Sequence, residues 1–180
     1  SKAEVAINET ERLLNQEKVD MIMGVFSSAH CVPMAQRVDQ AKNFMWATIC
    51  VASSVFKDKN LRYVFRPQVH SDQFGAASCD FLAEKAESSL GKKVGDLKVA
   101  IIFEDGPYGA GIAAGNEAVC GKHGMQIVLK EGYSATAPDL SPLVTKLRRA
   151  RPDVILHTGY NPDITLFLRQ AKEQGLKWQA

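Results

Sequence analysis

The stretch VDMIMGVFSSA, residues 19–29, places a short apolar run directly before two serines. Residues 19–26 are numerous enough for a buried strand and too few for a membrane-spanning helix. Helical spacing of apolar residues resumes after the serines and predicts a helix over residues 33–41. Ser27 and Ser28 are therefore expected at the point where a buried strand gives way to a helix.

This position matters because the carboxyl ends of the strands are where ligands bind in a parallel α/β sheet. A helix start also leaves backbone N–H groups unpaired, and these favour an anion such as a carboxylate. Ser27 and Ser28 are thus candidate ligand-binding residues. Serine is also a preferred N-cap residue, so a role as a helix cap alone would explain either of them.

The composition excludes several classes of function. The net charge of +2 is too small to indicate a nucleic-acid partner, and the basic residues have no aromatic residues interleaved. No apolar run reaches the roughly 18 residues of a transmembrane helix. The chain opens on a polar, amphipathic pattern, so no signal peptide is expected within it. The four cysteines and four histidines lack zinc spacing, so no metal site is expected.

The cysteines are expected to be small buried apolar residues rather than disulfide partners. Cys31 and Cys50 each follow a predicted strand and could lie close together. The spacing does not decide their disulfide state, so it does not indicate a redox compartment either.

Apolar runs and helical patterns alternate along the rest of the chain, as in α/β proteins with parallel sheets. The run KVAIIF is continuously apolar, as a strand covered on both faces requires. A long helix begins near residues 70–72. Strands are predicted over residues 44–49, 63–66, 98–103, 126–129 and 154–157. The buried side of the long helix is predicted to carry Phe74, Ala77, Phe81, Leu82 and Lys85.

Sequence motifs for catalysis are weak. The loop EDGPYGAG at 104–111 has neither the glycine spacing of a dinucleotide-binding motif nor the lysine of a phosphate-binding loop, so no cofactor is expected. Glu104 and Asp105 are expected to be solvated loop residues. His30 and His157 lie after or at the end of strands and could contact a ligand, although a structural role is the more common one.

Small polar and aromatic residues follow several of the predicted strands. Serines occur at 27–28 and 53–54, and Tyr108 and Tyr160 lie in later loops. Hydroxyls and backbone N–H groups from the serines, together with flat tyrosine rings, would suit a small organic anion. Each tyrosine could equally be an ordinary surface or core residue.

Five segments in order resemble one family along nearly the whole chain. They are VDMIMGVFSSA, WATICVASS, YVFRPQVHSDQFGAA, KVAIIFEDGPYGAG and the stretch from DLSPLV to KEQGL. This series resembles the substrate-binding proteins of ABC transporters of the branched-chain amino acid type. The resemblance implies a two-lobe type I periplasmic binding fold with parallel sheets, a ligand between the lobes, and a hinge that lets them close.

The resemblance also implies a domain organisation. The first crossover of the family would place residues 1–69 in part of lobe one and residues 70–180 in most of lobe two. The chain would cover about half of a family member, so the fold is expected to be incomplete at both ends. The acidic partner that the family uses for a ligand ammonium group would lie beyond residue 180.

Binding residues of the family can be carried over by motif to the first part of the chain. Ser28, with Ser27 and Ala29 beside it, matches the segment that holds a ligand carboxylate. Val51 and Ser53 match the loop whose carbonyl and hydroxyl meet the α-ammonium and carboxylate. The segment CVASS replaces the SPAAT that is common in relatives. The larger side chain of Val51 is not expected in a site for a simple branched-chain amino acid.

Two aromatic residues can be carried over to the later part of the chain. Tyr108 matches the lobe-two tyrosine that covers the ligand, and Tyr160 matches a second lobe-two aromatic residue. The implied ligand is a small carboxylate or amide, because relatives bind amino acids, aromatic acids, amides and urea.

The function implied is that of a solute receptor without catalysis, periplasmic or lipid-anchored outside the cell. It would capture an amino acid or aromatic carboxylate and deliver it to an ABC permease in the membrane. Two alternatives stay open at this point. The same fold serves as the ligand-sensing domain of receptors and regulators, and an α/β enzyme could use Asp105 or a histidine.

Overall fold

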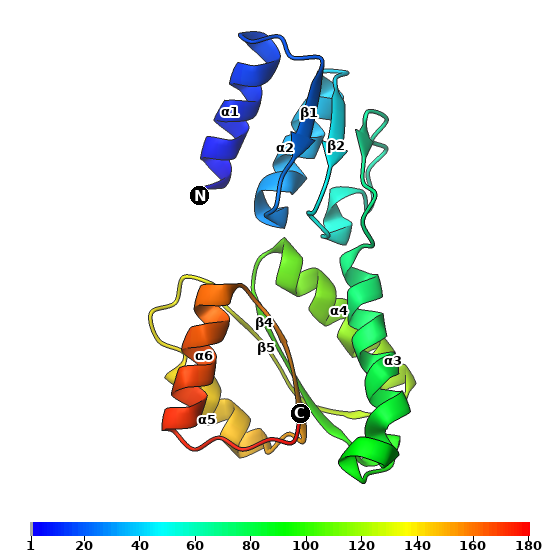
Figure 1. Cartoon of the computed structure of the whole chain (residues 1–180), viewed down its shortest axis with the longest axis vertical. Helices are drawn as coiled ribbons and strands as arrows, with labels where there is room; N and C mark the ends of the chain where they lie inside the picture. The colour runs from blue at the N-terminus through cyan, green and yellow to red at the C-terminus, as the bar shows by residue number, and fades with distance from the viewer. Residues whose placement is uncertain (1) are drawn as a thin grey trace. The chain divides into compact units, whose positions relative to one another are not determined.

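The computed structural model describes residues 2–180, and the chain divides into two compact units, Ser1–Ser71 (unit 1) and Asp72–Ala180 (unit 2). Each unit contains a three-stranded sheet in which all the strand pairs are parallel, with helices packed against it (Figure 1). The predicted α/β class with parallel sheets is confirmed. Among the described residues, no helix has the length and apolarity that a membrane span requires.

Unit 1 is built around the sheet β1-β2-β3, whose strands pair in that order. Residues of β1, β2 and β3 form one core with α2, and α1 packs beside α2. An ion pair between Glu11 and Arg37 joins the two helices. The elements are α1 (Ala3–Asn15), β1 (Met21–Gly24), α2 (Ser28–Gln40), β2 (Phe44–Ala47), the 3-10 turn η1 (Ser53–Val55) and β3 (Val64–Phe65).

The boundaries of β1 and α2 differ from those predicted. β1 ends at Gly24 because Gly24 and Val25 have φ values of 132° and 72°, which turn the chain out of the extended conformation. α2 begins at Ser28, five residues before the predicted start, and includes Pro33 within the helix. The prediction of a later start was wrong because proline was assigned to the first turn.

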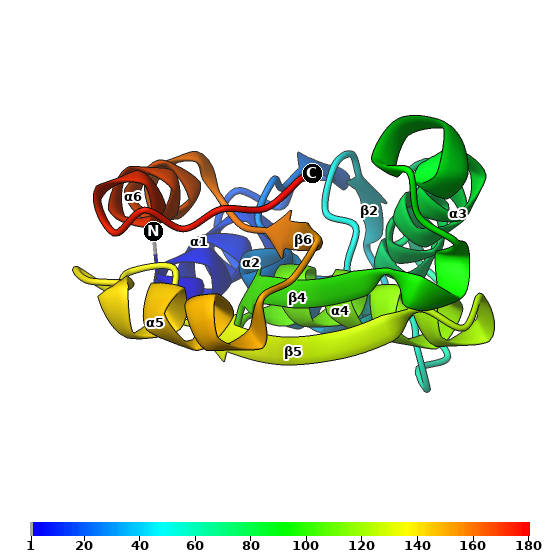
Figure 2. The same cartoon turned by 90° about the horizontal axis from the view of Figure 1, so that it is seen from below.

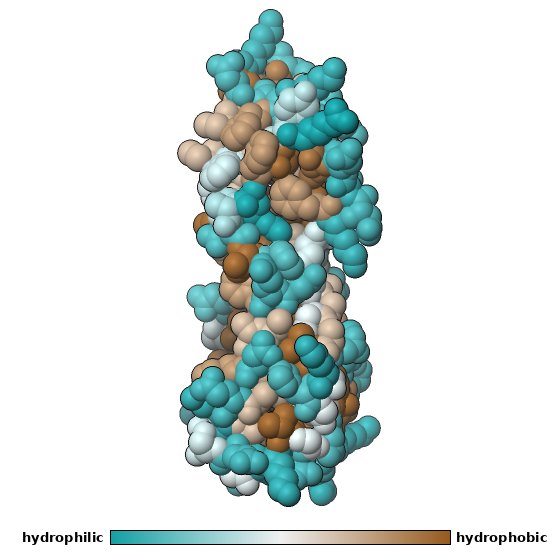
Figure 3. Space-filling model, turned by 90° about the vertical axis from the view of Figure 1, so that its right-hand side faces the viewer, coloured by the Kyte–Doolittle hydropathy of each residue, from teal (hydrophilic) through white to brown (hydrophobic). Residues whose placement is uncertain are grey.

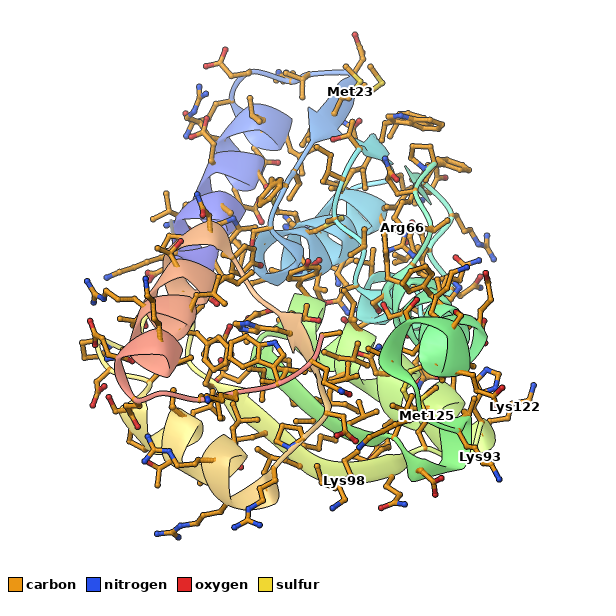
Figure 4. All side chains as sticks on the ribbon, turned by 60° about the horizontal axis from the view of Figure 1, so that its bottom comes forward. Met23, Arg66, Lys93, Lys98, Lys122 and Met125 are labelled. Carbon is orange, nitrogen blue, oxygen red and sulfur yellow. A yellow bond between two sulfur atoms is a disulfide. The ribbon has the colours of Figure 1, made fainter. Side chains whose placement is uncertain are left out.

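The sheet of unit 1 has one covered face and one open face. Ile22, Met45 and Val64 point into the core, where each is less than 7% exposed. Met23 is 65% exposed and Phe65 is 45% exposed, because they point to the opposite face. Met23 projects outward from β1 in Figure 4, and apolar residues of unit 1 are visible at the surface in Figure 3. Period-two alternation thus places apolar residues on both faces.

Neighbouring residues of β1 offer a matched test of this arrangement. In the 180-residue chain, Ile22→Ala should lower the free energy of unfolding by about 2–4 kcal/mol because it leaves a cavity in the core. Met23→Ala should change it by less than about 0.5 kcal/mol because the side chain is exposed. Urea unfolding measures both, and equal losses would contradict the assignment of the two faces.

Unit 2 is built around the sheet β5-β4-β6, with β4 at its centre. The long helix α3 starts at Ser71, as predicted within one residue. Figure 1 and Figure 2 show α3 and α4 on one side of this sheet and α5 and α6 on the other. The elements are α3 (Ser71–Leu90), η2 (Val94–Asp96), β4 (Lys98–Glu104), α4 (Pro107–Lys122), β5 (Gln126–Tyr133), α5 (Ser141–Ala150), β6 (Val154–Thr158) and α6 (Asn161–Glu173).

The central strand β4 explains the continuously apolar run in the sequence. Val99 and Ile101 pack in the core shared with α3 and α4, while Ala100 and Ile102 pack in the core shared with α5 and α6. All four side chains are fully buried. A parallel strand with helices on both faces has no solvent face and therefore needs no polar alternation.

The predicted buried face of α3 is wrong for most of its residues. Phe81 is 60% exposed and Phe74 is 43% exposed, whereas Leu82 is buried as predicted. The face that packs on α4 carries small residues, including Gly75 and Cys79. A Cβ atom built on Gly75 would lie 2.4 Å from the carbonyl oxygen of Ile112 in α4. The close approach of the two helices excludes large side chains from their contact.

Glycine substitutions on the two helices should have opposite effects. Gly75→Ala should lower the free energy of unfolding by about 1–3 kcal/mol, since its methyl group would collide with the α4 backbone. Gly121→Ala, where no atom lies within 4 Å of the added Cβ, should raise it by up to about 1 kcal/mol through helix propensity. Thermal unfolding of both variants checks the sign, and a stabilised Gly75→Ala would show that the helices do not meet there.

The expectation that the cysteines are free is also wrong. The structure contains the disulfides Cys31–Cys50 and Cys79–Cys120, and no cysteine among residues 2–180 is free. The first joins α2 to the segment after β2, and the second joins α3 to α4. All four residues are buried, as expected. Sequence separations of 19 and 41 residues do not reveal which elements fold against one another.

Candidate functional site

In unit 1, the serines that follow β1 form the start of α2. Ser27 is the N-cap residue, with extended backbone angles, and its carbonyl oxygen accepts hydrogen bonds from the N–H groups of His30 and Cys31. Ser28 is the first helical residue and is only 2% exposed. The first turn of α2 contains no acidic residue. Ser27 and Ser28 thus lie between β1 and α2, as the sequence predicted, and Ala29 is in the first turn of the helix.

The segment after β2 comes to the same end of the sheet. The backbone N–H of Ala52 donates to the Ser28 hydroxyl across 3.2 Å, and the disulfide Cys31–Cys50 holds this segment to α2. The predicted residues Val51 and Ser53 flank Ala52. The five candidates of unit 1 therefore belong to two adjoining segments, because both segments leave parallel strands at the same edge.

Ser71, which sequence reasoning missed, braces the segment after β2. Its backbone N–H donates to the Val51 carbonyl oxygen across 2.8 Å, and its hydroxyl accepts from the Ser53 N–H across 3.1 Å. The hydroxyls of Ser53 and Ser71 are 2.9 Å apart. Ser71 is fully buried and begins α3. Ser71 thus connects the segment that contains Val51 and Ser53 to the start of α3, where unit 1 ends.

Arg66 also stabilises the segment after β2, and sequence reasoning missed it. Its Nη1 atom donates to the carbonyl oxygens of Cys50 and Ala52, at 3.2 and 2.9 Å, and its guanidinium lies 5.1 Å from the centre of the Phe56 ring. Arginine suits this place because its planar group can bond two carbonyls and also stack on a ring. The only sequence signal was an arginine immediately after an apolar strand.

In unit 2, the structure brings the two predicted tyrosines together. Tyr108 lies in the first turn of α4 and Tyr160 is the N-cap residue of α6. Their ring centres are 5.4 Å apart, and both residues are partly buried. They meet because α4 and α6 begin after β4 and β6, which are neighbours in the sheet. Tyr108 and Tyr160 are referred to below as the tyrosine pair.

Glu104 corrects one expectation from the sequence. It was predicted to be solvated, but it is 4% exposed and ends β4. Its two carboxylate oxygens accept hydrogen bonds from the backbone N–H groups of Gly106 and Gly109, at 2.8 and 2.6 Å. Asp105 is exposed, as expected. A carboxylate that folds back onto a helix start is stabilised by the N–H groups and the helix dipole.

A second buried carboxylate lies at the start of α6. Asp163 is 3% exposed, and its Oδ1 atom accepts from the Tyr160 backbone N–H across 2.9 Å. Its Oδ2 atom accepts from the Tyr133 hydroxyl across 2.6 Å. The Tyr133 oxygen also lies 2.7 Å from His157 Nε2. Since the Tyr133 hydroxyl donates to Asp163, it must accept from His157, which therefore carries its proton on Nε2.

The electrostatics of this cluster follow from burial. Burial lowers the pKa of His157 to about 4, against a smaller opposing effect of the Asp163 charge. Burial raises the pKa of Tyr133, and the hydrogen bond to Asp163 adds to this. The His157 ring also packs edge-on against Phe167, with centres 4.8 Å apart. The contacts support the structural role that the sequence favoured for this histidine.

The lowered pKa of His157 predicts a loss of stability in acid. The unfolded chain binds a proton to this residue below about pH 6.5, whereas the folded protein does so only below about pH 4. The free energy of unfolding should therefore fall as the pH drops from 6.5 to 4, by at most about 3 kcal/mol. Urea unfolding across this range measures the slope.

His157→Gln should reduce this acid-dependent loss, because the variant has no imidazole to protonate. His123→Gln removes a histidine elsewhere in unit 2 and should keep the loss that is due to His157. An NMR titration that placed the His157 pKa near 6.5 in the folded protein would contradict the prediction directly.

The whole chain matches the periplasmic binding protein family, over residues 1–180. It is 35% identical over 172 residues to a Leu/Ile/Val-binding protein homolog of Brucella suis biovar 1, covering 96% of this chain and 43% of that protein. The chain belongs to the periplasmic binding protein family. The resemblance drawn from the five sequence segments is thereby confirmed.

Solved structures share the fold. A leucine binding protein from Thermotoga maritima has a TM-score of 0.86 at 25% identity, covering 99% of this chain and 48% of that one. A solute binding protein of an ABC transporter from R. palustris, in complex with 4-hydroxybenzoate, has a TM-score of 0.82 at 19% identity, covering 97% and 45%. The chain thus spans about half the length of these proteins. The names of these relatives describe binding proteins rather than enzymes.

Proposed function

We propose that the protein is an extracytoplasmic solute receptor that binds a small carboxylate or amide and delivers it to an ABC permease. The observation that carries the proposal is membership of the periplasmic binding protein family along residues 1–180. Relatives named for leucine and for an ABC transporter complex with 4-hydroxybenzoate support a ligand among amino acids or aromatic acids. Binding would occur without chemical change to the ligand.

The division of the chain supports a two-lobe mechanism. We assign residues 1–69 to part of lobe one and residues 70–180 to most of lobe two. The two compact units, which divide after Ser71, support this assignment. Lobe closure on the ligand would then be a hinge motion of the kind that periplasmic binding proteins use.

The residues proposed to bind the ligand come from both units. In unit 1, the start of α2 would hold a carboxylate through the backbone and hydroxyls near Ser27, Ser28 and Ala29. The absence of an acidic residue in the first turn of α2 supports this, because a carboxylate there would repel an anion. Val51 and Ser53 would contribute a carbonyl and a hydroxyl from the adjoining segment.

In unit 2, Tyr108 and Tyr160 would cover the apolar or aromatic part of the ligand. Their rings already lie within contact distance of each other and remain partly accessible. Aromatic side chains are rigid and offer a large apolar surface to a ligand. The tyrosine pair is therefore the element whose removal should weaken binding most.

The full-length protein provides the test. A thermal-shift screen of amino acids and aromatic carboxylates should find a stabilising ligand, because binding to the folded state alone raises its stability. Tyr160→Ala should then lower the affinity at least about tenfold by isothermal titration calorimetry, equivalent to about 1.4 kcal/mol. Tyr63→Ala, which truncates an exposed tyrosine at the edge of unit 1, should leave the affinity unchanged.

Two outcomes would overturn the proposal. One is that no amino acid or aromatic carboxylate stabilises the full-length protein at millimolar concentration. The other is that a bound compound is recovered as a different chemical species, which would indicate catalysis.

A further inference from the structure

Both members of the tyrosine pair lie at or beside backbone N–H groups that donate hydrogen bonds to a buried carboxylate. Gly106 and Gly109, on either side of Tyr108, donate their N–H groups to Glu104. Tyr160 donates its own N–H group to Asp163. The two carboxylates therefore fix the backbone from which each ring projects.

Glycines leave the space that the carboxylates occupy. A Cβ atom on Gly106 would lie 2.6 Å from Glu104 Oε2, and one on Gly159 would lie 2.4 Å from Asp163 Oδ2. A Cβ atom on Gly109 would lie 2.2 Å from the Glu104 carbonyl oxygen. The missing side chains of Gly106 and Gly159 thus leave room for the two carboxylates at the helix starts.

The starts of α4 and α6 consequently have few N–H groups left for a ligand. Pro107 and Pro162 lie in the first turns and have no N–H group. The N–H groups of Gly106, Gly109 and Tyr160 are already donated to carboxylates of the same unit. Three of the N–H groups at these helix starts are therefore not available to an anion.

The buried charges also reach the tyrosine pair. The pKa of Tyr108 is raised by burial, with further contributions from the negative charges of Glu104 and Asp163. Both oxygens of each carboxylate accept hydrogen bonds, as expected of ionised groups. A ligand group at the tyrosine pair would therefore meet a negative potential.

We propose that Glu104 and Asp163 are positioning residues for the tyrosine pair, and that their negative charges exclude an anionic ligand group from the two rings. The part of the ligand that contacts the tyrosine pair is then neutral or cationic. The inference rests on the proposed function, because it concerns the part of the ligand that the tyrosines cover. It narrows the ligand class to monocarboxylates or amides and excludes compounds with a second carboxylate at that end.

The test compares matched probes on the full-length protein by isothermal titration calorimetry. The pairs are leucine against glutamate and benzoate against terephthalate, which differ in a second carboxylate. At least one monocarboxylate should bind at least tenfold more tightly than its dicarboxylate partner. Glu104→Gln and Asp163→Asn, which remove a charge at nearly constant size, should each reduce this ratio at least threefold.

Two further variants separate charge from position. Asp105→Asn removes the exposed neighbouring carboxylate and should leave the ratio unchanged. Tyr133→Phe removes a hydrogen bond to Asp163 but keeps its charge, so affinity for the monocarboxylate should fall while the ratio is retained. Circular dichroism confirms that each variant is folded, and Asp163→Asn reports independently if Glu104→Gln does not fold.

The outcomes distinguish this inference from the proposed function. If neither leucine nor benzoate binds and no other small carboxylate does, the proposed function fails. If a monocarboxylate binds but its dicarboxylate partner binds equally well, the inference fails alone. It also fails if both charge-removing variants lower the two affinities by the same factor, since that is the result of a purely structural role.

Discussion

Parallel pairing of the strands brings every strand-to-helix connection of a unit to one edge of its sheet. In unit 1 this constraint places Ser28 beside the segment that follows β2. The Ser28 hydroxyl can therefore accept a hydrogen bond from the Ala52 N–H. In unit 2 it places the starts of α4 and α6 side by side, so that Tyr108 and Tyr160 meet. Every candidate residue therefore owes its place to strand direction before any side-chain contact is considered.

The hydrophobic pattern was sufficient to predict the strands and the order of the elements, but not which faces meet closely. The apolar run of β4 was correctly interpreted because a doubly covered strand has a distinctive sequence. The buried face of α3 was misjudged because Phe74 and Phe81 dominated the apolar pattern. The contact with α4 depends on Gly75 and Cys79, and small residues of this kind contribute little to any measure of hydrophobicity.

The candidate site was predicted in part for a similar reason. Serines and tyrosines after strands are visible in a sequence, and the resemblance to the family assigned them roles. Glu104 and Asp163 were not recognised, because a carboxylate in a loop looks the same whether it is solvated or folded back onto a helix start. Three glycines beside them are the signal in retrospect, since Gly106, Gly109 and Gly159 are the positions where a side chain would collide with this arrangement.

The helix starts of the two units differ in the charged groups that they carry. The start of α2 has serines and no acidic residue in its first turn, so its N–H groups and dipole present a positive end. The starts of α4 and α6 carry buried carboxylates of their own, and the negative charges of these groups oppose the positive end of the helix dipole. Under the proposed function, the start of α2 would suit the ligand carboxylate, and the tyrosine pair would suit an uncharged part of the ligand. The protein's own carboxylates would then decide which helix starts can accept an anion.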